Sequence, residues 1–279
     1  MKIAYCGYDF FSASLRSLLN ADKNVYRLFT VPNRGSANSN QYMNDISTQF
    51  GIPISEERID DQTIRQLEEE GCELLITAAY NYKIPSLDSI DIRGINVHPT
   101  LLPQGRGEWP LPWVILTQQQ QSGISIHKLT QEYDAGDILL QRSFPVDAQE
   151  SLETLSAKVQ MYAKDWLLEV VNDFSNMWEH AKPQSGEVSN WGVPPREERT
   201  LDWHFDVEKL DRICRAFGKF GCYAKFNEQD WMVYLIKGWK QPHNYNIGDV
   251  VHRTSTETIV AAGDGLVSLI YFQKIRDNS

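Results

Sequence analysis

Short apolar runs alternate with amphipathic helical patterns through the first half of the chain. Residues 3–6 form an apolar run typical of a buried strand, and residues 12–19 place Leu15, Leu18 and Leu19 on one helical face. Residues 74–79 are apolar on both faces, as a central parallel strand requires. The alternation predicts a doubly wound, Rossmann-like parallel sheet, whose ligands bind beyond the carboxyl ends of the strands. The predicted strands cover 3–6, 25–31, 74–79, 94–98, 123–129 and 138–144, and the predicted helices cover 12–19, 40–50, 63–70 and 151–171.

The pattern changes after Val171. Residues 182–198 are rich in Pro, Gly, Ser and charged side chains, which is typical of a linker. A short helix over 207–217 and several short strands follow, separated by turn signals such as Gly263-Asp264-Gly265. We therefore expect a catalytic domain over 1–181, a linker over 182–198, and a small OB-like β-barrel domain over 199–279.

Composition narrows the class of protein. No apolar run approaches the roughly 20 residues that a membrane span needs. The N-terminus leads directly into a strand-like run without the layout of a signal peptide, so we expect a cytoplasmic protein with no membrane partner. The formal net charge of -10 disfavours a nucleic-acid partner, because neutralising phosphates requires an excess of Lys and Arg.

The most informative segment is Ile95-Asn96-Val97-His98-Pro99. Asn96 and His98 share one face of a strand because side chains alternate along it. Pro99 then ends the ladder and leaves both side chains near the edge of the sheet. A carboxylate, Asp134, follows later in Tyr133-Asp134-Ala135-Gly136-Asp137, before a further strand.

These three side chains suit the acylation of an amine. A positioned His can take the proton that the amine loses, and an Asn amide can donate to the oxyanion that forms. A carboxylate beside the imidazole would orient it and favour its protonated form. Asn96, His98 and Asp134 are therefore a chemically complete set without a metal or a covalent nucleophile.

Simpler interpretations exist for each residue. His98 alone would be a structural residue, Asn96 a strand-end cap and Asp134 a turn former. A metal site could combine His98, His127, Asp134 and Asp137, but no pair has the tight helical spacing of a metalloprotease, and His127 is expected at a partly exposed position in mid-strand. We predict no metal. A dinucleotide site is rejected because the first strand is not followed by GxGxxG.

The segments INVHPTLLPQGRG, SGISIHKL and YDAGDILLQ, in this order, resemble the folate-dependent formyltransferases. The resemblance runs from Met1 to about Gln160 and implies N10-formyltetrahydrofolate as co-substrate. It implies that Asn96 is the oxyanion donor, His98 the general base and Asp134 its partner. It also implies that the pterin lies against two loops, through Ala79, Tyr80, Asn81 and Tyr82, and through Tyr133 and Asp137.

The identity of the formyl acceptor is inferred from segments other than the one that holds Asn96 and His98 and the one that holds Asp134. A nucleotide-linked (dTDP or UDP) amino sugar is favoured because GRGEWPLPWVIL resembles sugar formyltransferases, and such an enzyme would serve lipopolysaccharide biosynthesis. Residues 31–40, where tRNA-acting members carry a basic insertion, hold one Arg and no Lys. Methionyl-tRNA is the alternative acceptor. The expected acceptor-binding residues are Tyr8, Pro99, Thr100, Arg106, Trp109 and Trp113.

Two further points stay open at the level of sequence. The chain could be a folate- or nucleic-acid-binding module without turnover, although all three members of the proposed triad are present. Sugar-acting relatives are often dimers, which leaves a homodimer as an open alternative.

Overall fold

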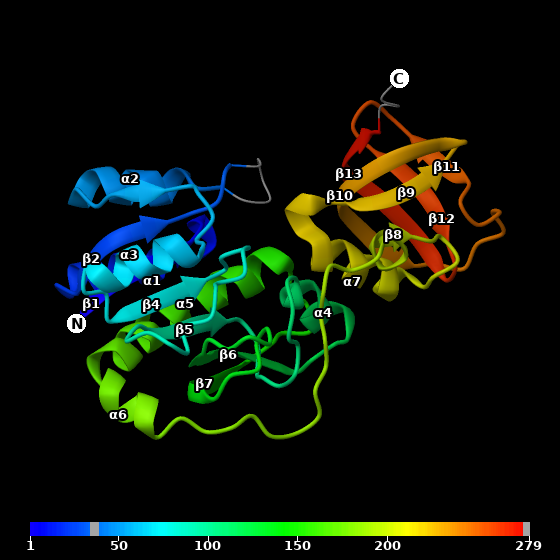
Figure 1. Ribbon diagram of the computed structural model, residues 1–279. Helices are drawn as coiled ribbons and strands as arrows, with labels where there is room; N and C mark the ends of the chain where they lie inside the picture. Colours follow the sequence, from blue (N-terminus) through cyan, green and yellow to red (C-terminus); the bar gives the residue numbers. More distant parts are fainter. Residues whose placement is uncertain (34–38, 276–279) are drawn as a thin grey trace. The chain divides into compact units, whose positions relative to one another are not determined.

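The computed structural model describes residues 1–33 and 39–275, and its contacts divide the chain into two compact units (Figure 1). Neither unit is a single continuous stretch of chain. The first comprises Met1–Pro110, Gln121–Pro145 and Ser156–Gly192, and the second comprises Leu111–Gln120, Val146–Leu155 and Val193–Ser279.

A seven-stranded sheet forms the centre of the first unit, with the order β3-β2-β1-β4-β5-β6-β7. All pairs from β3 to β5 are parallel, whereas β6 pairs antiparallel with both β5 and β7. The α/β class is therefore confirmed, and the sheet is mixed. The short link between β6 and β7 explains why these two strands are antiparallel, because a parallel crossover needs a dozen or more residues. The strands are β1 (Lys2–Gly7), β2 (Asn24–Phe29), β3 (Ile54–Ser55), β4 (Leu74–Ala78), β5 (Arg93–His98), β6 (Gln121–Lys128) and β7 (Ile138–Pro145).

Helices cover this sheet through their apolar faces. Helix α3 begins where the Asp60 side chain accepts the Thr63 backbone N–H at 2.8 Å. Its buried Ile64 and Leu67 belong to a core cluster that includes Ala4 of β1. The helices of the N-terminal two thirds are α1 (Ser12–Asn20), α2 (Gln41–Phe50), α3 (Asp61–Glu69), α4 (Pro110–Leu116), α5 (Leu152–Asn172) and α6 (Phe174–Glu179). In the described part of the chain, no helix combines the length and apolarity that a membrane crossing demands.

The second unit contains a six-stranded sheet with the order β11-β12-β13-β10-β9-β8. The pairs are antiparallel except β8 with β9. Helix α7 starts at an Asp206 cap and buries Leu210, Ile213 and Phe217. The β-rich C-terminal domain is thus confirmed. Its elements are β8 (Thr200–Leu201), α7 (Val207–Phe217), β9 (Cys222–Phe226), β10 (Gln229–Lys240), β11 (Val250–Arg253), β12 (Thr258–Ala262) and β13 (Gly265–Lys274).

The stretch expected as a linker differs from a free connection. Residues 182–192 belong to the first unit, where Lys182 bridges to Ile138 of β7 and Asn190 bridges to Arg106. The physical reason is that β7 is an edge strand and the loop at Arg106 is irregular, so both offer backbone groups that need partners. Composition identified the absence of regular structure in this stretch, but it carried no information about these pairings.

Candidate active site

Strand β5 carries two of the expected catalytic residues and is paired on both sides. Asn96 lies opposite Thr77 of β4 and opposite His127 of β6, and His98 lies opposite Ser125 of β6. Because β5 is interior to the sheet, its backbone is fixed on both edges. The two side chains therefore start from a rigid base at the carboxyl end of the strand.

Asp134 reaches the same place from the link between β6 and β7. Its backbone is in the left-handed region at φ 53°, a conformation that costs energy outside glycine and is tolerated best by Asn and Asp. One carboxylate oxygen, Oδ2, accepts the backbone N–H of Gly107 at 2.9 Å. The other, Oδ1, lies 3.5 Å from Nδ1 of His98. The structure thus brings the three predicted catalytic residues together.

The His98 ring has a defined tautomer. Its Nε2 lies 2.8 Å from the carbonyl oxygen of Gly105, which can only accept, so Nε2 carries a hydrogen. In the neutral ring, Nδ1 is then the basic atom. Gly105 has φ 73°, and a Cβ there would lie 2.4 Å from the Trp191 ring, so this turn requires glycine.

The protonation states of His98 and Asp134 follow from their surroundings. Burial lowers the pKa of His98 below its ordinary value of 6.5, and the negative charge of Asp134 opposes that shift. Burial alone would raise the pKa of Asp134. The charge of His98, the His127 side chain and the Gly107 amide outweigh it and hold the Asp134 pKa well below 3.8. At neutral pH the site therefore holds a neutral imidazole beside a carboxylate.

The Asn96 amide is oriented by three neighbours. Thr77 Oγ1 donates to Asn96 Oδ1 at 2.9 Å, which turns the NH2 group away from β4. Nδ2 then lies 3.2 Å from Asp134 Oδ1 and 3.1 Å from His127 Nε2. Both hydrogens of the amide therefore have an acceptor within this cluster.

His127 differs from the expectation of a partly exposed position. It is 1 % exposed, and its Nδ1 lies 2.9 Å from the carbonyl oxygen of Lys128. That contact places the hydrogen of the neutral ring on Nδ1 and leaves Nε2 to accept from Asn96. Sequence reasoning considered His127 only as a possible metal ligand and missed Thr77, because only the pairing of β5 with β4 and β6 places the two side chains beside Asn96.

The loops expected to hold the pterin lie at the ends of β4 and β6. Ala79 has φ 58°, and the rings of Tyr80 and Tyr82 meet edge to face with centroids 5.5 Å apart. The Tyr80 hydroxyl is used internally, accepting the Ile59 N–H at 3.3 Å. Asn81 is exposed.

The second of these loops presents Tyr133, whose side chain is 63 % exposed. The ammonium of Lys83 lies 5.5 Å from the centre of its ring. Asp137, in the same loop, is 3.6 Å from the Lys128 ammonium. The two loops are thus joined at the surface by a cation–aromatic contact.

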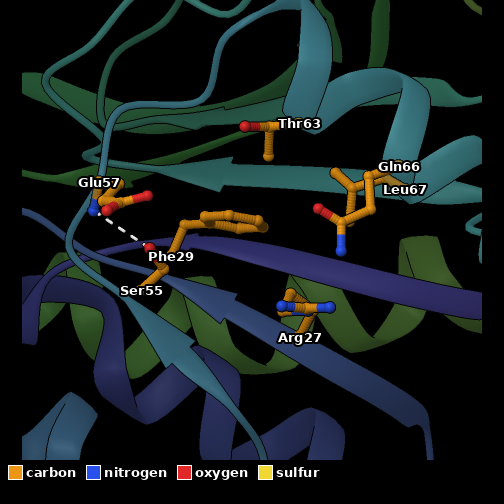
Figure 2. A pocket seen from close by; sticks show the side chains of 7 residues that line it. All are labelled: Arg27, Phe29, Ser55, Glu57, Thr63, Gln66 and Leu67. Carbon is orange, nitrogen blue, oxygen red and sulfur yellow. Dashed lines mark hydrogen bonds between the residues drawn. The ribbon is translucent and has the colours of Figure 1, made fainter.

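The described residues of the first unit line at least two cavities. One of about 500 Å³ is lined by Arg58, Lys83 and Gln131 together with Asp60 and Asp61, next to the loops just described. A smaller one of about 110 Å³, drawn in Figure 2, lies between β2 and α3 and is lined by Arg27, Phe29, Ser55, Glu57, Thr63, Gln66 and Leu67. Neither lining includes Asn96, His98 or Asp134, so the three predicted catalytic residues do not line either cavity.

The residues expected to hold the acceptor differ in their positions and contacts. Thr100 is 2 % exposed and its hydroxyl donates to the Gln104 carbonyl at 2.8 Å, so it serves the turn after β5. Arg106 is engaged by Gln184 at 2.8 Å and by Glu132 at 2.9 Å. The remaining expected residues have these positions: Tyr8 is half-buried after β1, Pro99 ends β5, Trp109 is half-buried beside Trp191, and Trp113 lies on α4 in the second unit.

Among residues 1–33 and 39–275, no group of three or more His, Cys, Asp and Glu side chains could hold a metal ion. The pair of histidines beside Asp134 is instead satisfied by the Gly105 and Lys128 carbonyls and the Asn96 amide.

A buried neutral imidazole with a free basic nitrogen, a carboxylate beside it and an oriented amide are the parts of an acid–base centre for group transfer. Comparison with known families names that class. A family model described as formyl transferase matches residues 8–171, and one described as formyl transferase, C-terminal domain, matches residues 195–277. The chain belongs to the formyl transferase family and is a folate-dependent enzyme with formyl-tetrahydrofolate as its formyl donor.

Similar curated proteins align with nearly the whole chain. Methionyl-tRNA formyltransferase of Streptococcus sanguinis is 27% identical, over 96% of this chain and 89% of its own length. Its counterpart in Treponema denticola is 28% identical, over 98% of this chain and 92% of its own length.

Similar solved structures share the fold. HypX from Aquifex aeolicus has a TM-score of 0.75 at 19% identity, covering 100% of this chain, which spans 47% of HypX. Another structure of HypX is a complex with tetrahydrofolic acid. The N-formyltransferase from Helicobacter canadensis, in complex with folinic acid and dTDP-3-aminofucose, has a TM-score of 0.69 at 15% identity and covers 99% of this chain and 100% of its own.

Proposed function

We propose that this enzyme transfers the formyl group of N10-formyltetrahydrofolate to a primary amine, with His98 as base, Asn96 as oxyanion donor and Asp134 as the partner of His98. The observation that carries the proposal is the convergence of the three side chains, with His98 Nδ1 as the one basic ring atom and Asp134 Oδ1 3.5 Å from it.

The transfer is balanced by one proton that passes through His98. The amine nitrogen forms a bond to the formyl carbon and loses a proton to His98 Nδ1. The bond from that carbon to N10 then breaks, and N10 receives the proton from the imidazolium. Asp134 stabilises the imidazolium between these two steps, because its charge lies beside the protonated nitrogen.

During the same transfer, the Asn96 amide donates a hydrogen bond to the oxyanion. Both amide hydrogens have acceptors when His98 is neutral. Once Nδ1 carries a proton, Asp134 Oδ1 accepts from it, and one Asn96 N–H is released toward the oxygen of the formyl group. A donor so placed lowers the barrier by about 3 to 4 kcal/mol.

The cavity near Tyr82 and Tyr133 supports a binding site for the folate co-substrate in this part of the first unit. Tyr82 and Tyr133 offer aromatic surface of the kind that holds a flat ring. The cavity of about 500 Å³ beside them contains the cations Arg58 and Lys83, which would attract the carboxylates of a folate. The anionic part of the co-substrate would lie there, with the pterin toward Ala79–Tyr82 and Asp137.

Methionyl-tRNA is the acceptor that the curated relatives favour, because those of that name align over 95–98% of the chain. The engagement of Arg106 also removes one support for a nucleotide sugar, since its guanidinium is already bonded to Gln184 and Glu132. We therefore place methionyl-tRNA first among the acceptors to be tested.

A nucleotide-linked amino sugar is the second candidate. It is favoured by the net charge of -10 and by the single Arg in residues 31–40, of which 34–38 lie outside the described residues. The Helicobacter canadensis structure of the same fold was solved with such a sugar. With this acceptor, the product would enter the synthesis of a formylated glycan.

The test is release of tetrahydrofolate from N10-formyltetrahydrofolate with methionyl-tRNA, dTDP-linked and UDP-linked amino sugars offered in parallel. The His98→Ala variant is the control for the catalytic centre and should be inactive with every acceptor. Turnover with methionyl-tRNA that weakens steeply with salt would support the first candidate. Turnover with a sugar alone, nearly independent of salt, would support the second. Wild-type turnover by His98→Ala would refute the proposed base.

A further inference from the structure

The segment 182–192, called the strap below, runs along the loops that carry the catalytic groups. Its first residue exchanges two backbone hydrogen bonds with Ile138 of β7, at 2.8 and 3.0 Å. Farther along, Ser189 donates its backbone N–H to the Pro103 carbonyl, and its own carbonyl accepts the N–H of Arg106 at 3.0 Å. The strap therefore contacts both the turn after β5 and the start of β7.

One side chain of the strap, Gln184, connects the Asp134 loop, between β6 and β7, to the Arg106 loop, which follows β5. Its amide nitrogen donates to the carbonyl of Asp134 at 2.7 Å and to that of Gly136 at 3.0 Å. Its amide oxygen accepts from the Arg106 guanidinium, at 2.8 Å from Nη2 and 3.3 Å from Nε. A single half-buried amide thus uses both of its ends, one on each loop.

Gln184 contacts a loop whose backbone conformation is unfavourable. Asp134 holds a left-handed backbone at φ 53°, and Gly136 cannot carry a side chain because a Cβ would lie 1.9 Å from the Lys128 carbonyl oxygen. A loop in such a conformation persists only when its surroundings determine it. The Gln184 amide holds the carbonyl of Asp134 itself and the carbonyl of Gly136, two residues farther along the same loop.

The strap also supports the His98 side of the site. Ser189 Oγ accepts the backbone N–H of Gly105 at 2.8 Å. The carbonyl of the same residue, Gly105, fixes the tautomer of His98. Trp191 closes the turn, since its ring lies against Gly105.

We propose that Gln184 is a positioning residue that locks the Asp134 loop to the Arg106 loop and thereby keeps the Asp134 carboxylate beside His98. The proposal rests on the roles proposed above for His98 and Asp134. It assigns a part in catalysis to a segment that follows the last helix of the sheet domain, far in sequence from the motif residues.

Two variants of Gln184 distinguish the hydrogen bonds made by its amide nitrogen from those made by its amide oxygen. Gln184→Ala removes all four contacts. Gln184→Glu keeps an oxygen for Arg106 but removes the donor to the Asp134 and Gly136 carbonyls. Both should lower kcat about 10- to 100-fold, with the KM for the folate changed by less than about threefold, because misplacement of a catalytic group acts on the chemical step. Glu187→Ala, an exposed change in the same strap, is the matched control and should behave as wild type.

A readout that does not depend on turnover distinguishes this proposal from the proposed function. The titration of the His98 ring is followed by NMR in the wild type, Gln184→Met and Asp134→Asn. Gln184→Met removes the hydrogen bonds of the amide without adding a charge. Asp134 opposes the lowering of the His98 pKa, so its displacement in Gln184→Met should move the His98 midpoint toward the lower value of Asp134→Asn.

Wild-type kcat in Gln184→Glu together with an unchanged His98 midpoint in Gln184→Met would overturn the role of Gln184, as would an equal effect in Glu187→Ala. Should Gln184→Ala fail to fold, Gln184→Glu carries the test, because it retains the Arg106 contact. If His98→Ala proves fully active, the proposed base is wrong, whereas the His98 midpoint still reports whether Gln184 holds Asp134 in place.

Discussion

Replacing Asp134 by Asn removes one negative charge from the site while it keeps the shape of the side chain. An Asn oxygen can still accept the Gly107 N–H that Asp134 accepts at 2.9 Å. What disappears is the attraction between the carboxylate and the imidazolium that forms when His98 takes a proton. The effect should therefore fall on the chemical step.

The distance sets the magnitude. At the 3.5 Å that separates Asp134 Oδ1 from His98 Nδ1, two unit charges attract by about 5 kcal/mol at an effective dielectric constant near 20. The Asp134 side chain is 12% exposed, so solvent screens little of it. Each 1.36 kcal/mol is a factor of ten in rate, so we expect kcat to fall by about three orders of magnitude.

The assay is tetrahydrofolate release with whichever acceptor supports turnover, at saturating folate. Glu108→Gln removes an exposed carboxylate one residue beyond Gly107 and serves as the control, with kcat expected within about twofold of wild type because surface substitutions change little. Thermal unfolding of both variants establishes that they are folded. A kcat for Asp134→Asn within threefold of wild type would refute the electrostatic role, because a neutral amide would then suffice.

Two further predictions concern the neighbours of Asp134. Because His98 must be neutral to take a proton and burial lowers its pKa below 6.5, kcat/KM should fall as the pH drops through a midpoint below 6.5; a midpoint above 6.5 would contradict the assignment. In Asp134→Asn, that midpoint should lie lower still, because the charge that opposes the shift is gone. Thr77→Val leaves the Asn96 amide free to turn, so kcat should fall about tenfold, as expected for a partly lost oxyanion donor, and Thr77→Ser should restore it. An equal loss in Thr77→Ser would indicate a packing effect instead.

Much of the fold follows from local patterns in the sequence. The helix over 207–217 has the predicted bounds, and the main strands of the first unit agree with the predicted ones within a few residues. Periodicity succeeds there because each element buries one face or both faces of its own. It fails for the two-residue strands β3 and β8, which are too short to show a period, and for the direction of β6, which runs antiparallel to both of its neighbours.

Some residues of the candidate site can also be predicted from local sequence patterns, and others cannot. Alternation along one strand places Asn96 and His98 on the same face, and a turn-forming composition around Asp134 is visible without any structure. The members of the cluster that lie on other elements leave no such signal. Thr77 and His127 meet Asn96 only because β4 and β6 pair with β5 in one particular register.

By itself, the sequence determined the α/β class, the β-rich C-terminal domain, the family and the three side chains with the right chemistry, because these depend on residue type and short-range spacing. Only the tertiary structure decided which nitrogen of His98 is basic, which way the Asn96 amide faces, and that Gln184 holds the Asp134 loop. Each of these depends on a hydrogen bond between atoms whose order along the chain does not specify their distance in space. The same reason explains why residues 182–192 have the composition of a linker and yet lie against the catalytic loops.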